Sequence, residues 1–222
     1  MFTKTLKAAV IGYCFALSQI ALAGPMGFDG SFMTMGDFNN NWREAFVNYA
    51  VTPRDAIGVS ATYMRSDDKS KTRTLEEVTY TRLLHRWNAP HSQANLWFVG
   101  GIGALQGKDE RVGKDDSFDK FVYTPGVQFD YETTRVYFAA NYRFYRASDI
   151  NHDYSSLRAG FSFYEAEYDK TQPWFILEAR NMNGLSDKVE ITPMLRFINK
   201  SFFVEAGMNT DYKPRFNFMY IF

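Results

Sequence analysis

Apolar and polar residues alternate with a period of two along most of this chain, and no other feature restricts its fold as strongly. Between residues 136 and 144 the even positions carry Val, Phe, Ala, Tyr and Phe, whereas the odd positions carry Tyr, Ala, Asn and Arg. Residues 189–197 repeat the pattern, with Val, Ile, Pro, Leu and Phe on one face. Because successive side chains of a β-strand point to opposite faces, each segment is predicted to be a strand with one apolar and one polar face.

The aromatic content indicates where the apolar faces lie. Phe, Tyr and Trp make up 18% of the sequence, although the mean hydropathy is −0.35. A soluble protein could bury so many rings only in a very large core, whereas a membrane barrel displays them toward lipid and turns polar residues inward. After residue 23 no apolar run reaches the ~18 residues of a helical span. We therefore predict an all-β fold, a closed antiparallel up-and-down transmembrane β-barrel.

Twelve segments follow the alternation, which predicts twelve strands. Tight turns, such as Thr52 to Asp55 and Asp169 to Gln172, alternate with longer charged loops such as Gln106 to Asp119. This asymmetry is typical of transmembrane barrels, and an even strand number places both chain ends on the periplasmic side. Residues 73–87 alternate poorly, so ten strands are the alternative. The predicted strands are residues 27–38, 42–51, 56–65, 73–87, 94–105, 120–131, 134–147, 155–168, 173–182, 188–198, 201–210 and 213–222.

The first 23 residues have the three regions of a secretory signal peptide. Lys4 and Lys7 form a short positive start, residues 8–22 are almost wholly apolar, and Ala21-Leu22-Ala23 fits a cleavage site. The apolar stretch is too short for a membrane helix, and the bulky Tyr13 argues against a lipoprotein site at Cys14. We predict a cleavable signal peptide over 1–23 and one barrel domain over 24–222.

Cleavage after Ala23 changes the composition in two ways. It removes the only cysteine, so the mature chain is expected to have no disulfide or thiol chemistry. It also removes two lysines and no acidic residue, which leaves 23 basic side chains against 25 acidic ones. No strong basic field remains to attract nucleic acid, so nucleic acid is not an expected partner.

The last strand resembles the terminal strand of Gram-negative outer-membrane β-barrels. Aromatic residues occupy every second position up to the final residue of the chain. Together with the signal peptide, this resemblance implies a small porin or channel-type barrel, exported through the periplasm to the outer membrane of a Gram-negative bacterium. It further implies contact with outer-membrane lipid and lipopolysaccharide, and recognition by the barrel-assembly machinery. The expected assembly signal consists of Phe216, Phe218, Tyr220 and Phe222.

The polar faces of the predicted strands define a mixed-charge lumen. Folding the chain about its predicted turns sets Asp130 opposite Arg135 and Arg180 opposite Glu190, within reach of an ion pair. The expected pore-lining residues are Glu44, Asp130, Arg135, Arg143, Arg158, Glu178, Arg180, Glu190, Arg196, Glu205 and Arg215.

One predicted pair has like charges. Folding about the loop near Ile150 brings Arg143 opposite Arg158, an arrangement that is destabilising without compensation. Glu178 on the next strand could compensate the two charges. Alternatively, two guanidiniums could hold the carboxylate or phosphate of an anionic solute, which would make the pore mildly anion-selective.

These features favour a passive channel for small solutes, with no cofactor. The interior of an eight-strand barrel has room only for side chains, whereas sixteen strands enclose a water channel. The bore of a twelve-strand barrel is intermediate in width. The alternative is an occluded structural or surface barrel, whose interior charges satisfy one another and whose loops serve adhesion or envelope integrity.

A second alternative is a lipid-modifying enzyme of the outer membrane. It would need a nucleophile or an activated water together with a base. His152 lies beside Asp153, Ser155 and Ser156 in a predicted external loop. Adjacent His and Asp residues on a loop are more often solvated, so no catalytic residue is assigned.

A third alternative is passage of a soft metal such as copper. Met26, Met33 and Met35 cluster near the mature N-terminus, and thioethers select Cu(I). Methionine is more often an adaptable filler of apolar surface, and neither His nor Cys accompanies the cluster. No metal ligand is assigned. The glycines at positions 100, 101 and 103 lie within a strand, so they indicate close strand packing or a bend.

Overall fold

The structure is a computed structural model that describes residues 24–112, 116–167 and 169–222. The predicted signal peptide lies outside these residues. Among them, no helix is long and apolar enough to cross a membrane. One short 3-10 helix, η1, spans Glu110–Val112. The strands are β1 Phe32–Phe38, β2 Trp42–Thr52, β3 Asp55–Arg65, β4 Thr72–Ala89, β5 Ser92–Lys108, β6 Ser117–Tyr123, β7 Gly126–Thr133, β8 Val136–Tyr145, β9 His152–Ser162, β10 Gln172–Asn183, β11 Ser186–Asn199, β12 Phe202–Met208 and β13 Pro214–Ile221.

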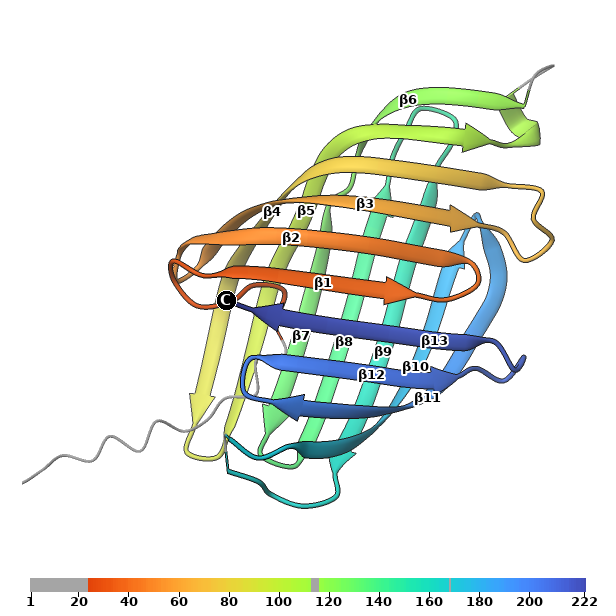
Figure 1. The fold of residues 1–222 in the computed structure, drawn as a ribbon. Coiled ribbons are helices and arrows are strands. Elements are labelled where there is room, and N and C mark those ends of the chain that lie inside the picture. Colours follow the sequence, from red (N-terminus) through yellow and green to blue (C-terminus); the bar gives the residue numbers. More distant parts are fainter. Residues whose placement is uncertain (1–23, 113–115, 168) are drawn as a thin grey trace, which may run out of the picture.

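The strands form one closed antiparallel barrel (Figure 1). Successive strands pair with each other except β6 and β7, and β1 pairs with β13 to close the sheet. β6 and β7 both pair with β5, β6 along residues 102–108 and β7 along residues 92–99. They are therefore two halves of one barrel strand, interrupted at Thr124 and Pro125, where proline has no N–H to donate. The thirteen segments make twelve barrel strands, which confirms the predicted number and the all-β fold.

Two predicted strand limits differ from the structure by five residues or more. β1 begins at Phe32 rather than at 27, because the residues before it are not in the ladder: Met26 is buried inside, and residues 28–30 form an exposed turn in which Gly30 has φ +75°. β9 ends at Ser162 rather than at 168, so the predicted tight turn is a longer connection. There the Gln172 side-chain amide donates to the Tyr164 carbonyl at 2.9 Å and ends the regular ladder. The residues after Ser162 alternate like a strand in sequence, although they bend away.

The two faces of each strand differ as the period of two predicts. In β13, Arg215 and Asn217 are buried inside the barrel, whereas Phe216 and Tyr220 are each 44% exposed on the outside. Phe222 continues the outer row, and its ring stacks on Phe32 with centroids 5.7 Å apart. The aromatic residues of the last strand therefore lie along the outer face of the closing seam.

The barrel has two distinct ends. The start of β1 and the end of β13 lie together, as their pairing of Met33 with Ile221 requires, and we call this the terminal end. The opposite end, here the loop end, has the connections 39–41, 66–71, 109–116, 146–151, 184–185 and 209–213. The connections of the terminal end are 53–54, 90–91, 134–135, 163–171 and 200–201.

The glycines of β5 allow β4 to approach closely, as the sequence indicates. A Cβ atom on Gly103 would lie 1.9 Å from the carbonyl oxygen of Glu76. A Cβ atom on Gly100 would meet the end of the Phe98 ring at 2.9 Å, where a side chain can move aside. We expect Gly103→Ala to destabilise the barrel by about 1–3 kcal/mol, the usual cost of overpacking, and Gly100→Ala to cost less. Thermal unfolding, followed as loss of the folded band on gels, measures both; equal shifts would contradict the close approach.

Candidate functional site

Eight charged side chains inside the barrel form a continuous chain of alternating carboxylates and guanidiniums, which we call the ion-pair chain. They come from β1 and from β9 through β13, so they occupy one side of the interior. Four acidic and four basic residues balance one another. In order of contact the members are Glu190, Arg180, Asp37, Arg215, Glu178, Arg158, Glu205 and Arg196.

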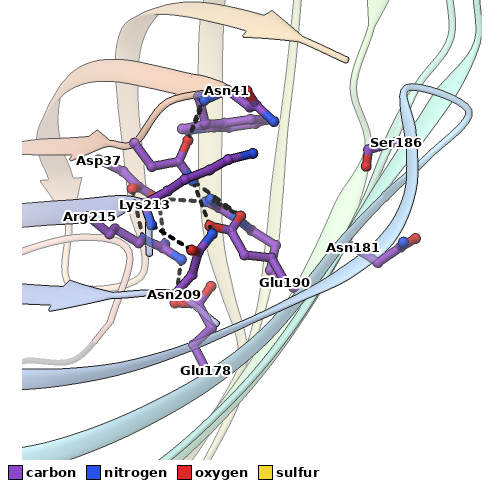
Figure 2. Close-up of polar contacts among 12 residues, drawn as sticks. Asp37, Asn41, Glu178, Asn181, Ser186, Glu190, Asn209, Lys213 and Arg215 are labelled. Atoms are coloured by element: carbon purple, nitrogen blue, oxygen red, sulfur yellow. Dashed lines mark hydrogen bonds and ion pairs between the residues drawn. The ribbon is translucent and has the colours of Figure 1, made fainter. Parts of the chain in front are cut away.

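The first part of the ion-pair chain crosses the closing seam of the barrel. Arg180 of β10 contacts Glu190 of β11 at 3.1 Å and Asp37 of β1 at 3.2 Å. Asp37 in turn lies 2.7 Å from Arg215 of β13. Figure 2 shows Asp37, Arg215 and Glu178 pointing toward one another, with Asn209 donating to Glu190 at 2.7 Å. Asp37 thus ties the first strand directly to β10 and β13, two strands from the later part of the sequence.

The second part continues toward the terminal end. Arg215 lies 2.9 Å from Glu178, which lies 3.1 Å from Arg158. Arg158 also contacts Glu205, and Glu205 accepts from Arg196 at 2.5 Å. Each interior carboxylate of this part is therefore shared between two guanidiniums.

Little solvent reaches the ion-pair chain. The side chains of Glu205 and Glu178 are 0% and 1% exposed, and that of Arg215 is 3% exposed. On the opposite wall Leu75 and Leu105 are also fully buried. These side chains are thus removed from water, whereas Asp37, Arg158 and Glu190 keep 17–20% of their side-chain surface exposed. Buried charges cost several kcal/mol each unless paired and hydrogen-bonded, and the alternation supplies that pairing.

A smaller polar group lies on the opposite wall. Arg143 of β8 contacts Glu77 of β4 at 2.7 Å, far away in sequence. Glu77 also accepts from Thr124 at 2.6 Å and from Ser60 at 2.9 Å. The break between β6 and β7 thus brings Thr124 into the interior, where it completes the partners of a buried carboxylate.

At the terminal end a third polar group surrounds Asp130 of β7. Its carboxylate accepts from the Asn95 amide at 2.6 Å and from the Trp97 indole N–H at 2.8 Å. Glu132, two residues on, is also buried on the inner face. Among the described residues, neither carboxylate forms an ion pair.

Two hollows lie at the two ends of the barrel. A pocket of about 30 Å³ at the loop end is lined by Arg180 and Glu190, the first members of the ion-pair chain. A cavity of about 760 Å³ at the terminal end is lined by Glu132 and Trp174. Trp174 is in register with Arg196, the last member. The ion-pair chain therefore runs from one hollow to the neighbourhood of the other.

Apolar residues cover another part of the loop end. Ile150 and Leu185, from two loops, pack with Met64 and Leu105 in one buried cluster. Arg73 and Arg111 anchor the neighbouring loop through Asp109, with contacts of 3.2 and 2.6 Å. The hydrogen bonds from Arg111 hold the pKa of the Asp109 carboxyl well below its usual range. This side of the loop end is closed by packing rather than by charges.

The structure confirms one predicted charge pair and contradicts two. Arg180 is opposite Glu190, as predicted. Asp130 is opposite Ala139, not Arg135, because the turn is centred on 134–135. Arg135 is exposed in that turn and donates to the Ser162 carbonyl at 3.3 Å.

The expected opposition of Arg143 and Arg158 is also wrong. Arg143 is opposite Tyr154, and Arg158 is opposite Ala139 on one side and Glu178 on the other. The loop between β8 and β9 is centred two residues earlier in the chain than assumed. Glu178 does compensate Arg158, as the first of the two interpretations expected, whereas Arg143 has Glu77 as its partner.

The remaining predicted positions face inward. Glu44 is half-buried on β2, where it accepts from the Trp42 indole at 3.2 Å, and Arg196, Glu205 and Arg215 belong to the ion-pair chain. Sequence reasoning missed two central carboxylates, Asp37 and Glu77. Asp37 shares the polar face of its strand with two methionines, so the alternation could have revealed it. Glu77 lies in the segment whose alternation was poorest.

The residues of the hypothetical loop enzyme are not brought together. His152 is buried inside the barrel and stacks on Tyr145 with centroids 4.2 Å apart. Asp153 faces the other way and contacts Arg146 at 2.6 Å. Neither ring nitrogen of His152 has a hydrogen-bond partner among the described residues. The geometry thus gives this histidine no nucleophile to activate.

The methionine cluster expected for soft-metal passage is also divided. Met26 packs with Leu83 and Trp97, whereas Met33 packs with Met219 in a separate cluster that Met35 joins. Within the described part of the chain, no group of three His, Cys, Asp or Glu residues is placed to hold a metal ion. The methionines serve as packing residues in the structure.

Comparison with known proteins finds similarity in fold only. No protein-family model matches the chain, and no curated protein matches it. The chain is similar to the KdgM porin in complex with disordered oligogalacturonate, at 12% identity over 86% of this chain and 98% of that chain, with a TM-score of 0.48. It is less similar to CdiB from Acinetobacter baumannii, at 10% identity over 86% of this chain and 60% of that one, with a TM-score of 0.35. The chain is also similar to OmpT, an outer membrane protein of Vibrio cholerae, at 10% identity over 89% of this chain and 99% of that chain, with a TM-score of 0.30. The closed twelve-strand barrel is consistent with a small outer-membrane porin-type barrel.

Removing one member of the ion-pair chain should be costly. Glu205→Gln leaves Arg158 and Arg196 buried without their shared carboxylate. We expect a loss of about 3–5 kcal/mol, as when a buried pair is broken, measured by denaturant unfolding in micelles. The control is Asp169→Asn, whose 3.9 Å contact with Lys170 is exposed and should be worth little. If Glu205→Gln lowers the free energy of unfolding no more than the control does, the ion-pair chain does not stabilise the barrel.

Proposed function

We propose that this chain is an outer-membrane channel for small solutes, closed at rest by the ion-pair chain. The observation that carries the proposal is the continuity of charge between the loop-end pocket, lined by Arg180 and Glu190, and the region of the terminal-end cavity. In this interpretation the terminal end faces the periplasm and the loop end faces the exterior. Solutes cross when the charged side chains separate.

The chemistry of the interior favours a path over a merely structural filling. Replacing buried ion pairs with well-packed apolar residues is often neutral or stabilising. A barrel that only needed a filled core would gain nothing from eight interior charges, five of which are almost fully buried. Twelve strands also enclose more space than the eight that side chains alone can fill. Polar walls along a twelve-strand bore are what a channel requires.

The sharing of partners suggests how the path opens. Arg158 contacts both Glu178 and Glu205, and Arg215 contacts both Asp37 and Glu178. A guanidinium that leaves one carboxylate can therefore keep the other. Rotamer changes of a few long side chains could open the bore without breaking the β-barrel.

The charge balance argues against strong ion selectivity. Four guanidiniums alternate with four carboxylates, so neither sign dominates the wall. The expected mild preference for anions rested on the opposition of Arg143 and Arg158, which the register removes. The proposed channel therefore passes small cations, anions and neutral solutes.

We also propose that the channel lies in the outer membrane, with the outer face of its last strand in contact with lipid. The outer face of β13 carries Phe216, Tyr220 and Phe222, which suits a lipid environment that includes lipopolysaccharide on the exterior. The same residues, with Phe218, are the proposed signal for the barrel-assembly machinery of a Gram-negative envelope. Insertion would follow signal-peptide cleavage and passage through the periplasm.

A second function is supported by the apolar packing at the loop end. Ile150 and Leu185 seal part of that end, as expected of an occluded barrel that only displays its loops. In that case the ion-pair chain would be a permanent plug.

Solute flux separates the two functions. The double variant Asp37→Ala/Arg215→Ala removes one carboxylate and one guanidinium from the middle of the ion-pair chain, and every remaining member keeps a partner. We expect severalfold faster ion flux through proteoliposomes than with the unmodified protein. The control Asp169→Ala/Lys170→Ala removes an exposed pair of the same net charge and should leave flux unchanged. Absence of flux in all three folded proteins would establish the occluded barrel instead.

A further inference from the structure

The start of the segment 24–31 enters the barrel at the terminal end, whereas residues 28–30 are exposed. Met26 is buried in a cluster with Leu83 and Trp97, side chains of the inner wall. The carbonyl oxygen of Pro25 accepts from the side-chain amide of Asn48 at 2.9 Å. Ser31 closes the turn that precedes β1 by donating to the Phe28 carbonyl at 2.6 Å. The start of the segment is held inside by both packing and hydrogen bonds.

Gly24 lies against the indole ring of Trp97. A Cβ atom on Gly24 would be 2.9 Å from Cζ2 of that ring and 3.5 Å from Cε2. Cε2 is bonded to Nε1, which donates to Asp130 at 2.8 Å. Gly24 and Asp130 therefore contact the same side chain, and the backbone at Gly24 lies in the neighbourhood of the Asp130 carboxylate.

Among the described residues, no cation touches the carboxylates at this place. Asp130 and Glu132 are both buried on the inner face of β7. Among the described residues neither forms an ion pair: Arg86 attracts both carboxylates and Arg196 attracts Glu132, but neither guanidinium touches them, and Arg86 donates to Asn95 at 2.6 Å instead. Two buried carboxylates without a cation are costly. This position differs from the ion-pair chain, where every acid has a guanidinium.

We propose that Asp130 and Glu132 form a binding site for the α-ammonium group of the mature N-terminus. The proposal rests on the predicted cleavage after Ala23, which gives Gly24 a positive charge beside Trp97. The ammonium supplies the missing cation, and charge-assisted hydrogen bonds hold it. Residues 24–26 then form an internal stopper at the terminal end, fixed by the charge that processing creates.

The reactivity of the N-terminal amine tests this site. The mature protein, folded in micelles, is treated briefly with an amine-acylating reagent, and the N-terminal peptide is quantified by mass spectrometry. We expect Gly24 to be acylated more slowly in the folded than in the unfolded protein, by about tenfold or more, whereas the exposed Lys170 reacts alike in both. Asp130→Asn/Glu132→Gln should abolish the protection.

Controls keep the outcome decisive. Glu165→Gln/Glu167→Gln removes two exposed carboxylates of the terminal end and should leave the amine protected. Met26→Gln leaves both site carboxylates in place but loosens the segment, so it should also increase acylation of Gly24. This variant tests the site if Asp130→Asn/Glu132→Gln does not fold. The site would be overturned by a Gly24 acylation rate that is the same in the folded and the unfolded protein, by protection that survives loss of both carboxylates, or by a mature chain that begins elsewhere. None of these readouts depends on conduction.

Discussion

The pairing of buried carboxylates with buried guanidiniums is the interaction on which this barrel interior depends. Each ion removed from water costs several kcal/mol, and only close, hydrogen-bonded partners offset that cost. Glu205 illustrates the solution, because it is fully buried and contacts Arg158 and Arg196 at once, with Asn217 donating at 2.7 Å. Where this pairing is complete the charged side chains are held in place.

The same contacts link function to closure of the fold. Asp37 lies on the first strand, and its partners Arg180 and Arg215 lie on strands near the other end of the sequence. The backbone ladder between β1 and β13 is thereby supplemented by charge pairs across the seam. A channel opened by separating these charges must leave the backbone ladder intact, which shared partners permit.

The sequence predicts the fold far better than it predicts the contacts inside the barrel. Alternation and aromatic content identify the twelve strands because burial against lipid imposes the period directly on each strand. The register across a hairpin depends instead on the turn, so the pairs of Arg143 and Asp130 were assigned wrongly where loop centres differ by two residues. Contacts between distant strands, such as Asp37 with Arg180, and the inward path of residues 24–26 leave no periodic signal to predict them.

Single-channel recording on the unmodified protein tests the central claim most directly. In a planar bilayer with a tenfold KCl gradient, a bore with balanced charges that opens by separation of ion pairs should give discrete openings. Their current should reverse close to zero voltage, because the alternating wall favours neither K⁺ nor Cl⁻. A folded barrel that stays silent at every voltage would contradict the account.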